Sequence, residues 1–220
     1  MADGSVAGGS DGGIDLASLL CSRLCHDLLS PVGAMNNGLE LLADETDPAM
    51  RARCIDLLGD SARAAAARLK YYRLAFGAGG GFGASLDPAD AREAIESLLA
   101  LTGKTRLDWQ VGEGPLPKRA VKLLLNAALI AHEALVRGGV LSIAAEMQDR
   151  GIEMVLRAEG PRVVVDPVIR AALTGQLAAH EVDSRTAVAW MVRDIAGHGG
   201  GGVQVAEPDG LLMIGLDYRD

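Results

Sequence analysis

The sequence predicts an α plus α/β protein: an N-terminal helical hairpin that forms a dimeric four-helix bundle, followed by a C-terminal α/β sandwich. Apolar residues recur at helical spacing through the first third of the chain. A glycine-rich stretch then interrupts that pattern, and helix-like and strand-like segments alternate after it. With 220 residues, of which 49% are hydrophobic, the chain is long enough for one large domain or two small ones.

The first predicted helix covers residues 14–42. Its apolar residues are spaced three or four apart, which places them on one broad face. They are Leu16, Leu20, Leu24, Leu28, Val32, Met35, Leu39 and Leu42. Cys21 and Cys25 belong to the apolar side, so we expect them to be small, buried core residues.

A second helix is predicted over residues 48–76, where Asp47 and Pro48 form a typical helix start. Only a few residues separate the two helices, which predicts an antiparallel hairpin. Two wide apolar stripes cannot be buried within one hairpin, so we expect a homodimer in which two hairpins form a four-helix bundle. The alternative is a monomer whose hairpin packs on the second domain.

We expect residues 1–12, which are polar and glycine-rich, to be disordered and residues 13–76 to form the hairpin domain. Residues 77–85 should form a flexible linker, and residues 86–220 the second domain. In that domain, helices are predicted at 88–101, 118–136 and 184–198, with a small helix within 166–177. Strands are predicted at 106–111, 140–147, 152–158, 203–207 and 211–218. This order favours helices layered on one face of a mixed sheet.

The most informative segment is the run from His26 to Pro31. His26 lies on the polar side of the first helix, where Ser22, Ser30, Gly33 and Asn37 would leave room for a partner. Asp27 could accept a proton or fix the imidazole tautomer. Pro31 removes a backbone hydrogen bond and should kink the helix near the histidine. The alternative is an ordinary solvated histidine on a helix with a tolerated kink.

Composition argues against several classes of protein. The formal net charge of −8 argues against a nucleic-acid-binding protein. The apolar runs are shorter than the roughly 18 residues that span a membrane, and the N-terminus does not resemble a signal peptide. We therefore expect a cytoplasmic protein, and its three cysteines fit a reducing compartment.

Cys21, Cys25 and His26 could suggest a metal site, but the ring points away from the thiols and a second cysteine pair is missing.

The run from His26 to Pro31 resembles the phospho-acceptor box of bacterial histidine kinases and histidine phosphotransferases. The stretch LLLNAALIAHEAL resembles the kinase helix that carries a metal- and nucleotide-binding asparagine, which Asn126 matches. The stretch SRTAVAWMVRDIAGHGG and the closing hairpin resemble the end of the kinase ATP-binding domain. Three kinase features are not matched. Residues 157–163 stand where a kinase has its adenine-reading motif, and the interval 166–177 is too short for the lid that closes over the phosphates. Lys122 stands where the kinase helix has another metal-binding polar residue.

An intact acceptor helix joined to a disabled ATP-binding domain resembles the dimeric histidine phosphotransferases. That resemblance implies that His26 accepts phosphate from the receiver of a CckA-like hybrid kinase and donates it to CtrA-like and CpdR-like response regulators. It also implies that Mg²⁺ comes with the receiver, and that neither ATP nor another cofactor is tightly bound. Two alternatives remain, a divergent ATP-dependent kinase and a receiver-binding module without phosphotransfer. His132, His180 and His198 are the other possible acceptors.

Overall fold

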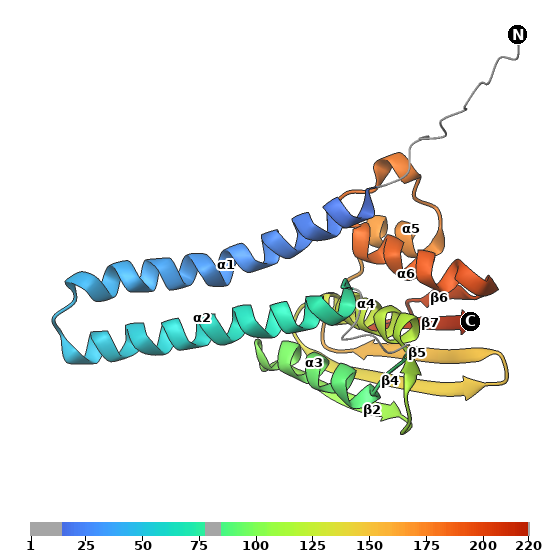
Figure 1. The fold of residues 1–220 in the computed structure, drawn as a ribbon, viewed down its shortest axis with the longest axis horizontal. Coiled ribbons are helices and arrows are strands. Elements are labelled where there is room, and N and C mark those ends of the chain that lie inside the picture. Colours follow the sequence, from blue (N-terminus) through green and yellow to red (C-terminus); the bar gives the residue numbers. More distant parts are fainter. Residues whose placement is uncertain (1–14, 78–84, 220) are drawn as a thin grey trace, which may run out of the picture.

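The computed structural model describes residues 15–77 and 85–219. Figure 1 shows two long helices that project from a layered domain of helices and strands. The segment 1–12, predicted to be disordered, lies outside the described residues, as does most of the predicted linker 77–85.

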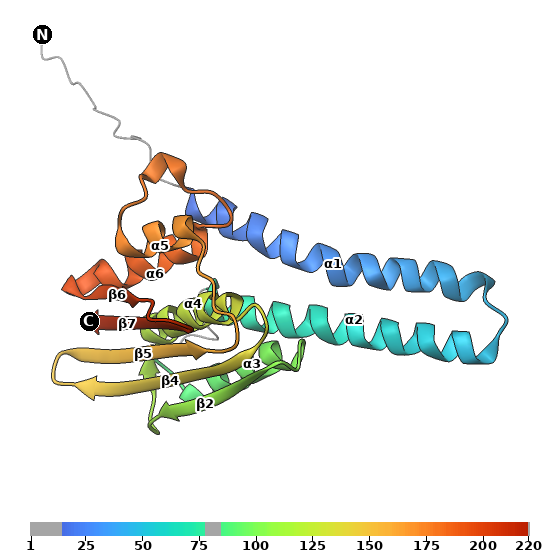
Figure 2. The same cartoon turned by 180° about the vertical axis from the view of Figure 1, so that it is seen from behind.

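The two long helices are α1 (Leu16–Asp44) and α2 (Pro48–Ala75), and they form the predicted antiparallel hairpin (Figures 1 and 2). Their starts have side-chain caps: the Asp15 carboxylate accepts from the backbone N–H of Ser18, and the Asp47 carboxylate accepts from those of Ala49 and Met50. α1 is one continuous helix through Pro31, so the proline does not divide it into two helices.

The C-terminal domain contains a five-stranded mixed sheet with the order β2-β4-β5-β7-β6. Its strands are β2 (Thr105–Val111), β4 (Gly139–Gln148), β5 (Gly151–Glu159), β6 (Gly202–Ala206) and β7 (Leu211–Arg219). β2 and β4 pair in parallel, whereas the other neighbours are antiparallel. The short pair β1 (Ser85–Leu86) and β3 (Leu116–Pro117) was not predicted.

Helices cover one face of this sheet (Figures 1 and 2). They are α3 (Pro88–Ala100), α4 (Lys118–Ala134), α5 (Pro167–Thr174) and α6 (Ala187–Gly197). β5 alternates strictly: Ile152, Met154 and Leu156 are buried, while the residues between them are exposed. Two 3₁₀ turns, Ala179–Glu181 and His198–Gly200, flank α6. The structure confirms the predicted hairpin and the layered α/β domain that the order of predicted elements favoured.

The end of α2 is anchored on α4. The Tyr71 hydroxyl, on a fully buried side chain, donates to the Leu125 carbonyl oxygen at 2.5 Å. The Asn126 side-chain amide donates to the Ala75 carbonyl oxygen at 2.8 Å. These contacts place the end of α2 at the junction between the hairpin and the C-terminal domain.

The structure corrects the expectation that Cys21 and Cys25 are buried, because both are exposed and only Cys54 of the three cysteines is buried. The physical reason is that each helix of a hairpin buries only the side that faces its neighbours. Large apolar side chains on the remaining side stay exposed: Leu29, Val32, Leu39, Ile55, Leu57 and Leu69.

Among the described residues, no helix has the length and apolar character required to cross a bilayer.

Candidate functional site

His26 lies on the exposed surface of α1, as predicted, with a side chain that is 82% exposed. Three of its predicted neighbours, Ser22, Ser30 and Asn37, are exposed, and Gly33 is half-buried. A Cβ atom added at Gly33 would meet no atom within 4 Å. The surface around the imidazole is therefore open enough for another protein to approach.

Asp27 contacts the imidazole directly. Its Oδ1 lies 3.1 Å from Nδ1 of His26, and its side chain is only 16% exposed. A deprotonated carboxylate can only accept a hydrogen bond, so this contact favours the tautomer with the proton on Nδ1. The lone pair of that tautomer is then on Nε2. In that tautomer, Nε2 carries its lone pair on an exposed side chain.

The second oxygen of Asp27 is held by two residues that sequence reasoning missed. Oδ2 accepts from the Tyr72 hydroxyl and from Nε of Arg23, the latter at 2.9 Å. Partial burial alone would raise the pKa of Asp27, but the hydrogen bonds from Tyr72, Arg23 and His26 outweigh burial and lower it. Asp27 is therefore an anion at neutral pH. The spacing of Arg23 and Asp27, one helical turn apart, was a signal that could have indicated their pairing.

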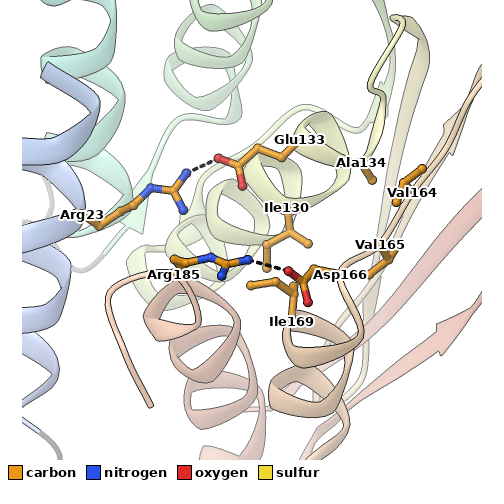
Figure 3. A pocket seen from close by; sticks show the side chains of 9 residues that line it. All are labelled: Arg23, Ile130, Glu133, Ala134, Val164, Val165, Asp166, Ile169 and Arg185. Carbon is orange, nitrogen blue, oxygen red and sulfur yellow. Dashed lines mark hydrogen bonds and ion pairs between the residues drawn. The ribbon is translucent and has the colours of Figure 1, made fainter. Parts of the chain in front are cut away.

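Arg23 connects this pair to the C-terminal domain. Its terminal nitrogen Nη2 donates to Oε1 of Glu133 on α4, and Figure 3 shows the two side chains pointing toward each other. Burial alone would lower the pKa of Arg23, but the carboxylates of Glu133 and Asp27 raise it above its ordinary value. Sequence reasoning also missed Glu133, which is 110 positions away along the chain.

Beside this contact is a cavity of about 190 Å³ (Figure 3). A second ion pair lies in its wall, between Arg185 and Asp166 at 2.6 Å. The other lining residues come from α4, the segment after β5 and the start of α5. These are segments that the kinase resemblance associates with nucleotide binding. The volume is below the about 300–1,000 Å³ that is typical of small-molecule pockets.

Asn126, which matches the nucleotide-binding asparagine of kinases, is completely buried. Its amide nitrogen donates to the carbonyl oxygens of Ala75 and Lys122. The side chain therefore joins α4 to α2 and does not line the cavity. Within residues 15–77 and 85–219, no group of three or more histidine, cysteine or acidic side chains is arranged to hold a metal ion.

The other histidines differ from His26. His132 is half-buried on α4, and burial lowers its pKa. His180 is exposed in a 3₁₀ turn. His198 follows α6, where its Nδ1 lies 2.8 Å from the backbone oxygen of Asp194. Among the four histidines, His26 alone combines an open ring with a mostly buried carboxylate at hydrogen-bonding distance.

The chain resembles known proteins over most of its length. The family described as "Histidine phosphotransferase C-terminal domain" matches residues 88–210. Protein phosphotransferase ChpT of Brucella abortus (strain 2308) is 40% identical over 177 residues, which cover 79% of this chain and 81% of that protein. A solved structure described as a bacterial phosphotransferase superposes with a TM-score of 0.81 at 33% identity, covering 91% of this chain and 95% of the other. The chain belongs to the histidine phosphotransferase family.

Proposed function

We propose that this protein is a phosphorelay intermediate that accepts a phosphoryl group on His26 and passes it to response-regulator receivers. The observation that carries the proposal is the exposed imidazole whose Nδ1 is held by Asp27. The donor is the phosphorylated receiver domain of a CckA-like hybrid kinase, and the acceptors are CtrA-like and CpdR-like receivers. This partner list rests on the family resemblance. We place the reaction in the cytoplasm.

In the proposed reaction, the Nε2 lone pair attacks the phosphorus of the receiver's aspartyl phosphate. An N–P bond forms as the P–O bond to the receiver breaks, and the receiver carboxylate leaves with that electron pair. The ring keeps its Nδ1 proton and gains positive charge, which the Asp27 anion stabilises at 3.1 Å. Transfer to the next receiver reverses these steps. The acidic residues of the receiver would hold the Mg²⁺ ion, so this chain would need no metal of its own.

We propose that transfer does not use ATP. Three observations support this part: the kinase-like asparagine, Asn126, is buried in a helix contact, the nearby cavity is small, and ion pairs occupy its wall. Phosphoryl transfer from ATP requires a site that holds the triphosphate and its magnesium.

We also propose that the protein is a homodimer formed by the hairpins of residues 14–76. Exposed apolar side chains support this, because Val32 and Leu39 extend the apolar arc of α1, and Ile55 and Leu69 lie on α2. A second hairpin would cover these residues in a four-helix bundle. The same contact would cover Cys21 and Cys25, which are exposed in the single chain.

The test is to incubate the protein with the phosphorylated receiver domain of a hybrid kinase and measure acid-labile label. We expect label on the wild type and on His180→Ala, which removes another exposed histidine, and none on His26→Ala. Label at the wild-type rate on His26→Ala would refute the assignment. Label from ATP alone would favour the kinase alternative, and receiver binding without label would favour a module without phosphotransfer.

A further inference from the structure

We propose that Tyr72 and Glu133 are positioning residues for phosphotransfer: they hold Asp27 against His26, Tyr72 directly and Glu133 through Arg23. The ATPase-like domain would then have an active role, because one of its side chains orients the acceptor on α1. This inference rests on the proposed phosphotransfer at His26.

Asp27 is held in one orientation by its hydrogen-bond donors. A carboxylate on a helix surface is normally free to rotate about its side-chain bonds. Here Oδ2 accepts from both Tyr72 and Arg23, and this fixes the plane of the carboxylate. Its other oxygen, Oδ1, is the one that faces Nδ1 of His26. Without the contacts at Oδ2, we expect the exposed imidazole to lose a fixed partner.

Arg23 is in turn oriented by Glu133. A guanidinium is planar and presents its donors in a fixed fork, so a second acceptor determines how the first is oriented. Nε donates to Asp27 and Nη2 donates to Glu133, and the latter contact sets the plane of the fork. Glu133 is on α4, which is tied to α2 by the Tyr71–Leu125 and Asn126–Ala75 hydrogen bonds. Tyr72 is on that same α2, so both supports of Asp27 belong to one anchored unit.

Arg23 and Asp27 are shielded from water, whereas Glu133 is half-exposed. Arg23 and Asp27 have side chains that are 15% and 16% exposed, and in the interdomain pair Arg23–Glu133 the glutamate is 45% exposed. Another ion pair between the hairpin and the C-terminal domain, Lys70–Glu93 at 2.7 Å, is 42% and 63% exposed. Exposed pairs contribute little because water screens them, whereas shielded hydrogen-bonded charges stay in place. Glu93 therefore offers a matched control: it also joins the two domains, but it does not contact the Asp27 network.

The experiment measures the rate of phosphate uptake from a phosphorylated receiver domain in a double-mutant cycle. We expect Glu133→Gln to slow uptake about tenfold, and Glu93→Gln to leave the rate unchanged. In an Asp27→Asn background, Glu133→Gln should cause no further loss, because it acts through Asp27. Tyr72→Phe removes the hydroxyl but keeps the ring that stacks on Phe76, and it should slow uptake in the same way. Thermal unfolding of each variant checks that it is folded.

A second readout does not depend on phosphotransfer. Nitrogen NMR of the His26 ring should show a smaller fraction of the Nδ1-protonated tautomer in Glu133→Gln and Tyr72→Phe, and no change in Glu93→Gln. The proposal would be overturned if Glu133→Gln and Tyr72→Phe both kept the wild-type rate of uptake and the wild-type tautomer fraction. It would also be overturned if Glu133→Gln slowed uptake equally in the wild-type and Asp27→Asn backgrounds. If the wild type takes up no label, the proposed function fails, and the tautomer measurement still decides whether these residues position the ring.

Discussion

The side-chain amide of Asn126 donates a hydrogen bond to the Ala75 carbonyl oxygen, 2.8 Å away, at the point where α2 ends. The last carbonyls of a helix have no partner within the helix, so a buried donor from α4 satisfies one of them. In a kinase-like domain this asparagine would be expected to face a nucleotide. Here it connects the α1–α2 hairpin to the domain that follows it.

We therefore predict that Asn126→Ala lowers the free energy of unfolding by about 1–3 kcal/mol, because it leaves the Ala75 carbonyl buried without this donor. Urea denaturation measures the change. Asn37→Ala, at an exposed position of α1, is the control and should have little effect. An equal stability for the two variants would show that the α2–α4 hydrogen bond contributes nothing.

ATP should not bind. The cavity near Arg23 and Arg185 is about 190 Å³, and both arginines are already paired with carboxylates. Titration calorimetry with ATP and magnesium should give only heats of dilution. A saturable isotherm at millimolar nucleotide would contradict this expectation and support the divergent-kinase alternative.

Asp27→Asn should slow phosphate uptake without abolishing it. The amide keeps the shape of the side chain but loses the negative charge that stabilises the positively charged ring. His26 would retain its Nε2 lone pair, so the reaction should continue. Single-turnover labelling by a phosphorylated receiver measures the rate. Loss of all label from a folded Asp27→Asn protein would mean that the carboxylate is essential.

The apolar face of the hairpin should mediate dimerisation. Leu39 and Leu41 are both exposed on α1, at 56% and 62%, but they point about 160° apart around the helix. Leu39 belongs to the apolar arc predicted from the sequence, and Leu41 does not. Leu39→Glu should shift the mass measured by light scattering from dimer to monomer, whereas Leu41→Glu should remain dimeric. A monomeric wild type at micromolar concentration would contradict the dimer itself.

The pH dependence of stability should include a contribution from His132. Burial lowers its pKa below the ordinary 6.5, and its Nδ1 lacks a hydrogen-bond partner in the part of the chain that the structure describes. The unfolded chain therefore binds this proton more readily. Stability from this residue is present above pH 6.5 and is lost as the pH falls from there through the folded-state pKa. His132→Leu should reduce the pH dependence of stability, measured by denaturation at several pH values.

Periodicity predicted the long elements well, because a helix or strand repeats its pattern many times. α1 and α2 start and end within two residues of their predicted limits. The strands β1 and β3 have two residues each and are too short to show any period. α6 begins at Ala187, later than the predicted residue 184, because the Asp183 carboxylate accepts from the backbone N–H groups of Arg185 and Thr186 and holds a turn there.

The site was predictable where it is local. His26 and Asp27 are adjacent in the sequence, and a single helical turn relates them to Arg23. Tyr72 and Glu133 reach the same cluster from α2 and α4, and their approach depends on how the hairpin packs on the domain. That packing leaves no short-range pattern in a single sequence. The burial of Cys21 and Cys25 was wrongly predicted for a related reason, since an apolar arc does not show which neighbour covers it.

α1 continues for several turns beyond His26. At a rise of about 1.5 Å per residue, His26 lies about 27 Å from the end of α1 at Asp44. Figure 1 shows that this part of the hairpin projects away from the C-terminal domain. A domain of about 100 residues has a radius of gyration of about 13 Å, which for a uniform sphere corresponds to a diameter of about 34 Å. In the proposed transfer, a receiver of that size would lie along the projecting hairpin while its phosphoryl group reaches the imidazole.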